Sequence, residues 1–411
     1  MKKNTIIDYL TYGSGQLINL IAPLLVAPKV ISVCGIESWG KIGVVLSIFT
    51  LLGLFIDFGS NILGVKEISI HKNNFSKIQD YLNTSFAIKL CFFTVIAFAI
   101  VLSNLIFIGI DHKLYFLAVT LLSAQFFNVT WIYQGFEKFG IINRIIFVSK
   151  TIYVGLVYLL ITKKEDYYLV LFILGSANTL VYFFFFIKIW KSYQLSFFNL
   201  KTDLIREQFK NEFSILISNF SIAIYVQSPI LIIQHLLGDY YAGIYKIGDM
   251  ILSIFRSYLS VFFNVSFPKF CESYSRNKKE GILFLKKINS LNIALLITGV
   301  LVVVIGGNLI ITKDIVNPKI YNLLSFYSGF IIVPIITALN IPFYQYLIYK
   351  NEQKVLSIIL SLGSLLMMIL GYFLTLFFKI QGSLIAVFLI ESLITTLIIL
   401  FSLKKYKWIS N

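Results

Sequence analysis

Acidic residues are scarce in a chain that carries little charge of either sign. Only 13% of the 411 residues are charged, and 19 Asp and Glu stand against 35 Lys and Arg. Hydrophobic residues make up 58% of the chain, and the mean hydropathy is +0.85. These values exclude an ordinary soluble domain and are typical of a polytopic membrane protein.

Cysteine and histidine are also rare, with 3 residues of each. Cys34, Cys91 and Cys271 are scattered, none of them in a CxxC pair, and the histidines are equally dispersed. The sequence therefore predicts no metal site, no disulfide framework and no cofactor. The net charge of +16 would suit nucleic acid, but the cations lie in short loops between apolar runs. With no basic domain and no Gly-rich phosphate loop, nucleic acid is not an expected partner.

Long apolar runs predict an all-α polytopic membrane protein with about twelve transmembrane helices. The run after Met1–Lys3 resembles a signal peptide, but it continues to about Val33 without a cleavage site, so we interpret it as an uncleaved first span. The expected spans are residues 6–33, 38–62, 81–108, 114–135, 140–162, 167–187, 211–237, 240–268, 283–311, 320–349, 353–378 and 380–403.

Similar residues at corresponding places in the two halves predict two six-helix lobes. Gly35 after the first span corresponds to Gly238 after the seventh, at a shift that other positions share. An even number of spans per repeat makes the repeat parallel, and a central cavity is then expected between the lobes. We expect an N-terminal lobe over residues 1–195, a cytoplasmic linker over 196–210 and a C-terminal lobe over 211–411.

Cations are distributed unevenly along the predicted topology. Most lie in loops on the side of the termini, as at Lys66 and Lys279, and few lie opposite, as at Lys163. The positive-inside rule therefore predicts that both termini are cytoplasmic. Within the spans, the cations are Lys29, Lys41, Lys89, Lys150, Lys246 and Arg256, and the acids are Asp57, Asp249 and Glu391. Because an embedded cation needs water or an anion, this positive excess is the main functional clue.

One stretch, Tyr240–Pro268, is long and apolar enough to span a membrane and still has a polar face. Its polar residues share one side at helical spacing: Lys246, Asp249, Ser253, Arg256, Ser260 and Asn264. Lys246 and Asp249 can pair, whereas Arg256 lies roughly 10 Å beyond Asp249 along the axis. We therefore expect Arg256 to lack a partner on its own helix. It would either bind an anion or form a salt bridge to Glu391 on another helix.

Short blocks in both halves carry a family resemblance. They are PLLVAPKVISVCGIESWG from Pro23, FIDFGSN with Asp57, KEIS from Lys66, NVTWIYQGFEKFG with Asn128, Trp131 and Gln134, GDYYAGIYKIGD from Gly238, and FPKF from Phe267. Together they resemble the Wzx-type flippases for O-antigen and capsule repeat units. These belong to the multidrug/oligosaccharidyl-lipid/polysaccharide exporter (MOP) superfamily. The resemblance implies a water-filled cavity that opens alternately to the two sides of the bacterial inner membrane. It also implies an undecaprenyl-diphosphate-linked oligosaccharide as substrate.

On this interpretation the embedded residues have expected roles. The substrate-binding cations are Arg256, Lys246, Lys29, Lys150 and Lys89, and the residues for ion coupling or salt bridges are Asp249, Glu391 and Asp57. The cavity-lining or motif residues are Ser253, Ser260, Asn264, Asn128, Trp131 and Gln134. The expected partners are the lipid-linked glycan and membrane lipids, with a polysaccharide polymerase and chain-length proteins as further candidates. Since no nucleotide-binding motif is present, an ion gradient is the expected driving force.

Two positions depart from the family pattern, and other functions remain open. Ser32 replaces a common Arg, with Lys29 one turn earlier, and Ser228 replaces a common acid. A lipid II-type flippase or a multidrug or cation exporter of the same superfamily is the alternative, although a cation exporter is expected to carry excess carboxylates. A membrane-bound sugar polymerase would need a large outer loop, and the longest one predicted is only Thr312–Lys319, so we expect no enzyme.

Overall fold

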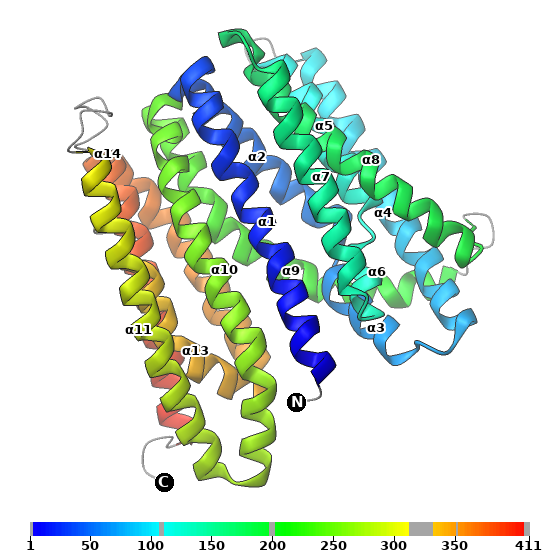
Figure 1. The fold of residues 1–411 in the computed structure, drawn as a ribbon, viewed down its shortest axis with the longest axis vertical. Helices are drawn as coiled ribbons and strands as arrows, with labels where there is room; N and C mark the ends of the chain where they lie inside the picture. The colour runs from blue at the N-terminus through cyan, green and yellow to red at the C-terminus, as the bar shows by residue number, and fades with distance from the viewer. Residues whose placement is uncertain (1–2, 107–110, 197–201, 312–331, 351, 407–411) are drawn as a thin grey trace. The chain divides into compact units, whose positions relative to one another are not determined.

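The computed structural model describes residues 3–106, 111–196, 202–311, 332–350 and 352–406 (Figure 1). Within these ranges the regular structure is entirely helical. Two compact units divide the chain, Met1–Gln227 and Ser228–Asn411. The predicted linker over 196–210 lies earlier than this division. From Thr202 onward it is already helical, and its residues 197–201 lie outside the described ranges, as does the predicted loop Thr312–Lys319.

The first unit is a bundle of long helices with short joints. Its helices are α1 (Lys3–Cys34), α2 (Ile36–Asp57), α3 (Val65–Ile70), α4 (Phe75–Ile106), α5 (His112–Phe127), α6 (Thr130–Gly135), α7 (Phe139–Leu160), α8 (Leu169–Ser192) and the larger part of α9 (Thr202–Leu237). Helix α5 packs against α8, and α1 packs against α7. The apolar composition of these helices explains why they pack against one another, since each helix has too few charged residues for a face in contact with water.

The second unit contains the end of α9, then α10 (Asp239–Arg276), α11 (Lys278–Ile311), α13 (Val333–Tyr349) and α14 (Gln353–Tyr406). The backbone of α14 breaks at Lys379, where φ is 54°, so α14 is two successive helices. This break agrees with the predicted boundary between the last two spans. The predicted span 320–349 is described only from its residue 332 onward.

Ten helices of the described residues are long and apolar enough to cross a membrane. One of these ten is α14, which the break at Lys379 divides in two. The predicted span 114–135 is interrupted: α5 ends at Phe127, and α6 begins at Thr130. Asn128 lies in this interruption, and its Oδ1 accepts from the Thr130 N–H at 3.0 Å and from the Thr130 hydroxyl at 2.6 Å. A side chain that satisfies a free N–H in this way favours a helix start.

Two glycines support the predicted relation between the halves. Gly35 is the single residue between α1 and α2, and Gly238 is the single residue between α9 and α10. Their φ angles are 89° and 88°, a region that side-chain-bearing residues avoid. The same sharp joint therefore follows the first and the seventh of the predicted spans.

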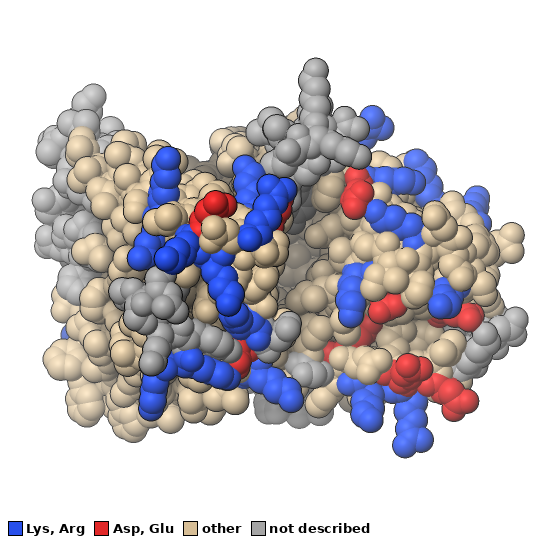
Figure 2. Space-filling model, turned by 90° about the horizontal axis from the view of Figure 1, so that it is seen from below, with Lys and Arg blue, Asp and Glu red and all other residues tan. Residues whose placement is uncertain are grey.

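The basic loops of each unit gather at one end of that unit. In the first unit these are the turns between α3 and α4 and between α6 and α7, and in the second they are the turn between α10 and α11 and the end of α14 (Figure 1). Figure 2 looks onto these helix ends, and Lys and Arg side chains outnumber Asp and Glu there. This agrees with the predicted clustering of cations, while the membrane side that it faces stays a prediction.

Candidate functional site

The polar face of α10 forms an ion triad around one carboxylate. Asp249 Oδ2 lies 3.1 Å from Lys246 Nζ, and Asp249 Oδ1 lies 3.0 Å from Arg256 Nη1. The expectation that Arg256 lacks a partner on its own helix is therefore wrong. The axial rise separates Cα atoms, but a helical side chain leans toward the N-terminus, and the long Arg side chain extends back to Asp249. Two cations around one carboxylate leave the triad with a net positive charge.

The triad is only partly shielded from its surroundings. Side-chain exposure is 14% for Asp249, 15% for Lys246 and 31% for Arg256. Ser253 on the same face donates to the backbone carbonyl of Met250. The other stripe residues lie in more open positions: Ser260 and Asn264 are exposed. Glu391 is half-buried in α14. The structure thus brings together three of the predicted site residues, Lys246, Asp249 and Arg256.

Lys150 lines a separate cavity of about 290 Å³ inside the first unit. Its polar neighbours in the lining are neutral: Thr50, Gln125, Asn178 and Tyr182. Among the residues that the structure describes, no carboxylate belongs to this lining. Asn178 Oδ1 is buried, and among the described residues it has no hydrogen-bond partner. Because Lys150 occupies the middle of α7, it lies at membrane depth, where a cation without an acid beside it is costly. This cavity can hold an anionic or hydroxyl-rich group.

Lys89 was predicted to bind substrate, but it is buried in an ion pair instead. Its exposure is 0%, and its Nζ lies 3.8 Å from Asp57 Oδ1 and 5.2 Å from the centre of the Trp131 ring. The interpretation of Lys89 as a cation open to an anionic ligand is wrong for this structure. Asp57 ends α2, where Phe58 and Gly59 both adopt positive φ and turn the chain. That turn places the Asp57 carboxylate in the core beside α4.

Apart from Trp131, which lies beside Lys89, the remaining predicted residues are dispersed. Lys41 pairs with Asp111 at 3.2 Å near the opposite helix ends. Lys29 is half-buried in α1, and its carbonyl accepts from the Ser32 hydroxyl at 2.9 Å. Gln134 is half-buried in α6. Trp131 is 1% exposed. Its ring packs closely against Gly64, where an added Cβ would lie 2.5 Å from a ring atom. Asn128 and Trp131 of the family motif thus shape the fold of the first unit.

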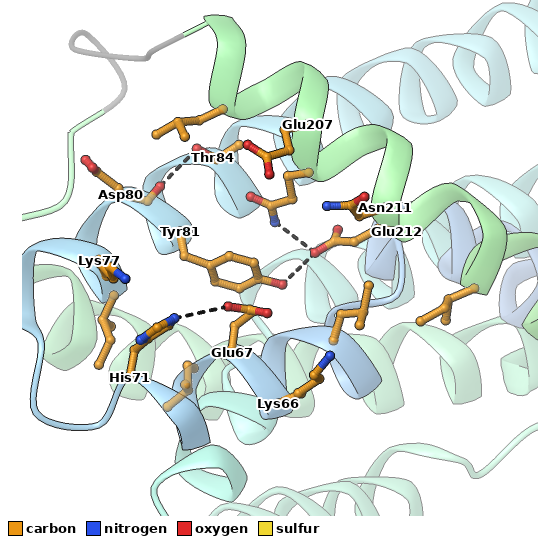
Figure 3. Close-up of a pocket in the computed structure, with 16 residues that line it drawn as sticks. Lys66, Glu67, His71, Lys77, Asp80, Tyr81, Thr84, Glu207, Asn211 and Glu212 are labelled. Atoms are coloured by element: carbon orange, nitrogen blue, oxygen red, sulfur yellow. Dashed lines mark hydrogen bonds and ion pairs between the residues drawn. The ribbon is translucent and has the colours of Figure 1, made fainter. Parts of the chain in front are cut away.

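Sequence reasoning missed one buried acid, Glu212. It lies near the start of α9, is 2% exposed, and lines a cavity of about 700 Å³ together with Tyr81 (Figure 3). It was overlooked because it is the second residue of the predicted span 211–237, directly after the mixed-charge linker predicted over 196–210. An acid within the first turn of an apolar span was the available signal.

The fold is shared with solved transporters. An inward-facing multidrug resistance MATE family transporter of the MOP superfamily matches with a TM-score of 0.72 at 11% identity, over 95% of this chain and 96% of that one. A MOP superfamily transporter from Pyrococcus furiosus matches with a TM-score of 0.63 at 11% identity, over 97% and 94%. The class is therefore the two-lobed, polytopic fold of MOP-superfamily transporters.

The chain belongs to the family described as "Polysaccharide biosynthesis protein", which matches residues 6–274. Two relatives, from Escherichia coli (strain K12) and Shigella dysenteriae, are each provisionally named an O-antigen transporter. Both are 22% identical to this chain. The first match covers 98% of this chain and 96% of the relative, and the second covers 99% and 100%. Family and fold together make the protein a multi-pass membrane transporter rather than an enzyme.

Proposed function

We propose that the protein translocates undecaprenyl-diphosphate-linked oligosaccharide units across the bacterial inner membrane by alternating access. An ion gradient drives the cycle, and both termini face the cytoplasm. The membership of the polysaccharide family and the names of the two relatives support the substrate class. The gathering of basic side chains at one end of each unit supports the orientation.

The observation that carries the proposal is the cavity at Lys150. A diphosphate or an acidic sugar that crosses the membrane interior needs a positive partner where water is scarce. Lys150 supplies that charge with amide and hydroxyl groups around it, which is the polar surface that a glycan can use for hydrogen bonds. A cation exporter would need carboxylates in this position, and the described part of the chain contributes none to the lining.

Substitution of Lys150 tests the proposal in proteoliposomes that contain the purified full-length protein and an undecaprenyl-diphosphate-linked oligosaccharide. Translocation is measured as the rate at which the glycan becomes accessible to an external glycosidase. Losing one charge-assisted hydrogen bond of about 1.5–3 kcal/mol predicts a roughly ten- to hundred-fold loss of substrate affinity for Lys150→Ala. Lys150→Arg keeps the charge and should retain partial transport.

Arg144 provides the matched control, because it is an exposed cation on the same helix, one to two turns earlier. Arg144→Ala should transport at the wild-type rate. Equal transport by Lys150→Ala and Arg144→Ala, at equal protein levels, would refute the role of Lys150. Transport of lipid II in place of the oligosaccharide-linked lipid would identify the protein as a lipid II-type flippase instead.

A further inference from the structure

Glu212 is held by two donors at the wall of the 700 Å³ cavity. The Tyr81 hydroxyl donates to Glu212 Oε1 at 2.5 Å, and Gln208 Nε2 donates to the same oxygen at 2.9 Å (Figure 3). Gln208 Nε2 also lies 2.6 Å from Ser85 Oγ. The carboxyl group is therefore fixed in one orientation, at the inner surface of a cavity that is open to the outside of the bundle.

A buried ion pair lies behind Glu212. The Lys89 ammonium interacts electrostatically with both carboxylates, Asp57 and Glu212. It stands 3.8 Å from Asp57 Oδ1, beyond hydrogen-bonding distance. Among the residues that the structure describes, neither Lys89 Nζ nor Asp57 Oδ1 has a hydrogen-bond partner. Two acids thus share one base in the core of the first unit.

The charges of this cluster do not balance when every group is ionised. Asp57 and Glu212 contribute two negative charges and Lys89 one positive charge, and each of the three residues is at most 2% exposed. A buried net charge is unfavourable, so the cluster favours the uptake of one further positive charge. A metal ion is disfavoured, because the described residues include no group of three His, Cys, Asp or Glu side chains that could hold one. A proton on a carboxyl group needs no additional ligands.

The cavity offers such a proton a route to Glu212. Its lining is rich in titratable and charged side chains from three segments. They are Lys66 and Glu67 on α3 with His71 just after it, Lys77, Asp80 and Tyr81 on α4, and Glu207 on α9 itself. Glu67 and His71 lie 3.7 Å apart below Tyr81 (Figure 3). Proton exchange with the solvent through these groups requires no opening of the core.

We propose that Glu212, together with Asp57 and Lys89, is the proton-binding site that couples a proton gradient to transport. In the binding step, the Glu212 carboxylate takes one proton from the cavity, and the cluster becomes neutral. This inference rests on the proposed ion-driven transport. Helix α9, which carries Glu212, begins in the first unit and ends in the second, so a change in the charge at its base acts on the segment that joins them.

Infrared difference spectra of the purified full-length protein test proton binding without transport. Between alkaline and acid pH, the wild type should gain the carbonyl-stretch band of a protonated, buried carboxyl group, and Glu212→Gln should lose it. Tyr81→Phe should keep the band but move it to higher frequency, because a hydrogen bond to the carbonyl has been removed. Asp203→Asn, an exposed acid near the start of α9, is the matched control and should leave the band unchanged.

A transport measurement separates this site from the proposed function. In proteoliposomes, Glu212→Gln should lose the acceleration by an imposed proton gradient and retain the slow, gradient-free equilibration of the lipid-linked glycan. A band that survives in Glu212→Gln, or disappears only in Asp57→Asn, would overturn the assignment to Glu212, whatever the transport result. Wild-type protein that shows the Glu212 band and transports no lipid-linked glycan would instead refute the proposed function alone.

Discussion

Neutralising Asp249 should destabilise the second unit, because it leaves two neighbouring cations without their shared acid. Asp249→Asn removes both ion pairs, at 3.1 Å to Lys246 and 3.0 Å to Arg256. Breaking a fully buried pair by removing one partner costs about 3–5 kcal/mol. Arg256 is 31% exposed, so solvent screens part of this loss, and we expect about 2–3 kcal/mol.

Thermal unfolding of the purified protein in detergent, followed by size-exclusion chromatography, measures this effect. A loss of that size predicts a decrease of roughly 5–10 °C in the unfolding midpoint. Lys246→Met added to Asp249→Asn removes one of the two repelling charges and should restore about half of the loss. Glu272→Gln is the matched control. It breaks an i, i+4 pair with Arg276 at 2.7 Å, but the two side chains are 65% and 75% exposed. Its expected cost is below about 1 kcal/mol.

Two outcomes would contradict the electrostatic argument. The first is an unfolding midpoint of Asp249→Asn equal to that of Glu272→Gln, and the second is a double variant that is less stable than Asp249→Asn alone. The same variants also separate a structural role of Asp249 from ion coupling. If Asp249 only organises the two cations, folded Asp249→Asn protein keeps gradient-dependent transport, whereas a coupling role predicts that this dependence disappears.

Two further predictions concern helix packing and topology. Gly175→Ala should cost about 1–3 kcal/mol in the same unfolding assay, because the new Cβ would lie 2.2 Å from Thr120 Oγ1 and 2.6 Å from its backbone carbon. Gly155→Ala meets nothing within 4 Å and should be neutral or slightly stabilising, so equal effects of the two would refute the packing argument. Reporter fusions at Lys163 and Lys279 should signal the outside and the inside, respectively. The reverse result at either site would disprove the orientation.

Local sequence patterns were sufficient to predict the helical architecture and much of its detail. The apolar runs located the described membrane helices, although α9 begins nine residues before its predicted span and α10 ends eight residues after its own. Location from sequence is possible because the length of a span and the cost of charge inside it act on each segment separately. Gly35 and Gly238 were recognised as equivalent joints, and both have the positive φ that glycine permits. The family motifs around Asp57 and Trp131 were sufficient for the correct superfamily.

The pairing of side chains was decided by the tertiary structure. Sequence spacing separated Arg256 from Asp249, yet the direction and length of the Arg side chain join them. Lys89 was expected to meet an anion, but the turn after α2 brings Asp57 to it across 32 residues of chain. Glu212 reaches Tyr81 only because α9 packs beside α4. A contact between residues distant in the chain depends on the relative placement of whole helices, which no single segment specifies. The sequence by itself determined which residues enter the membrane, and only helix packing decided which embedded charges are neutralised and which remain available, as at Lys150.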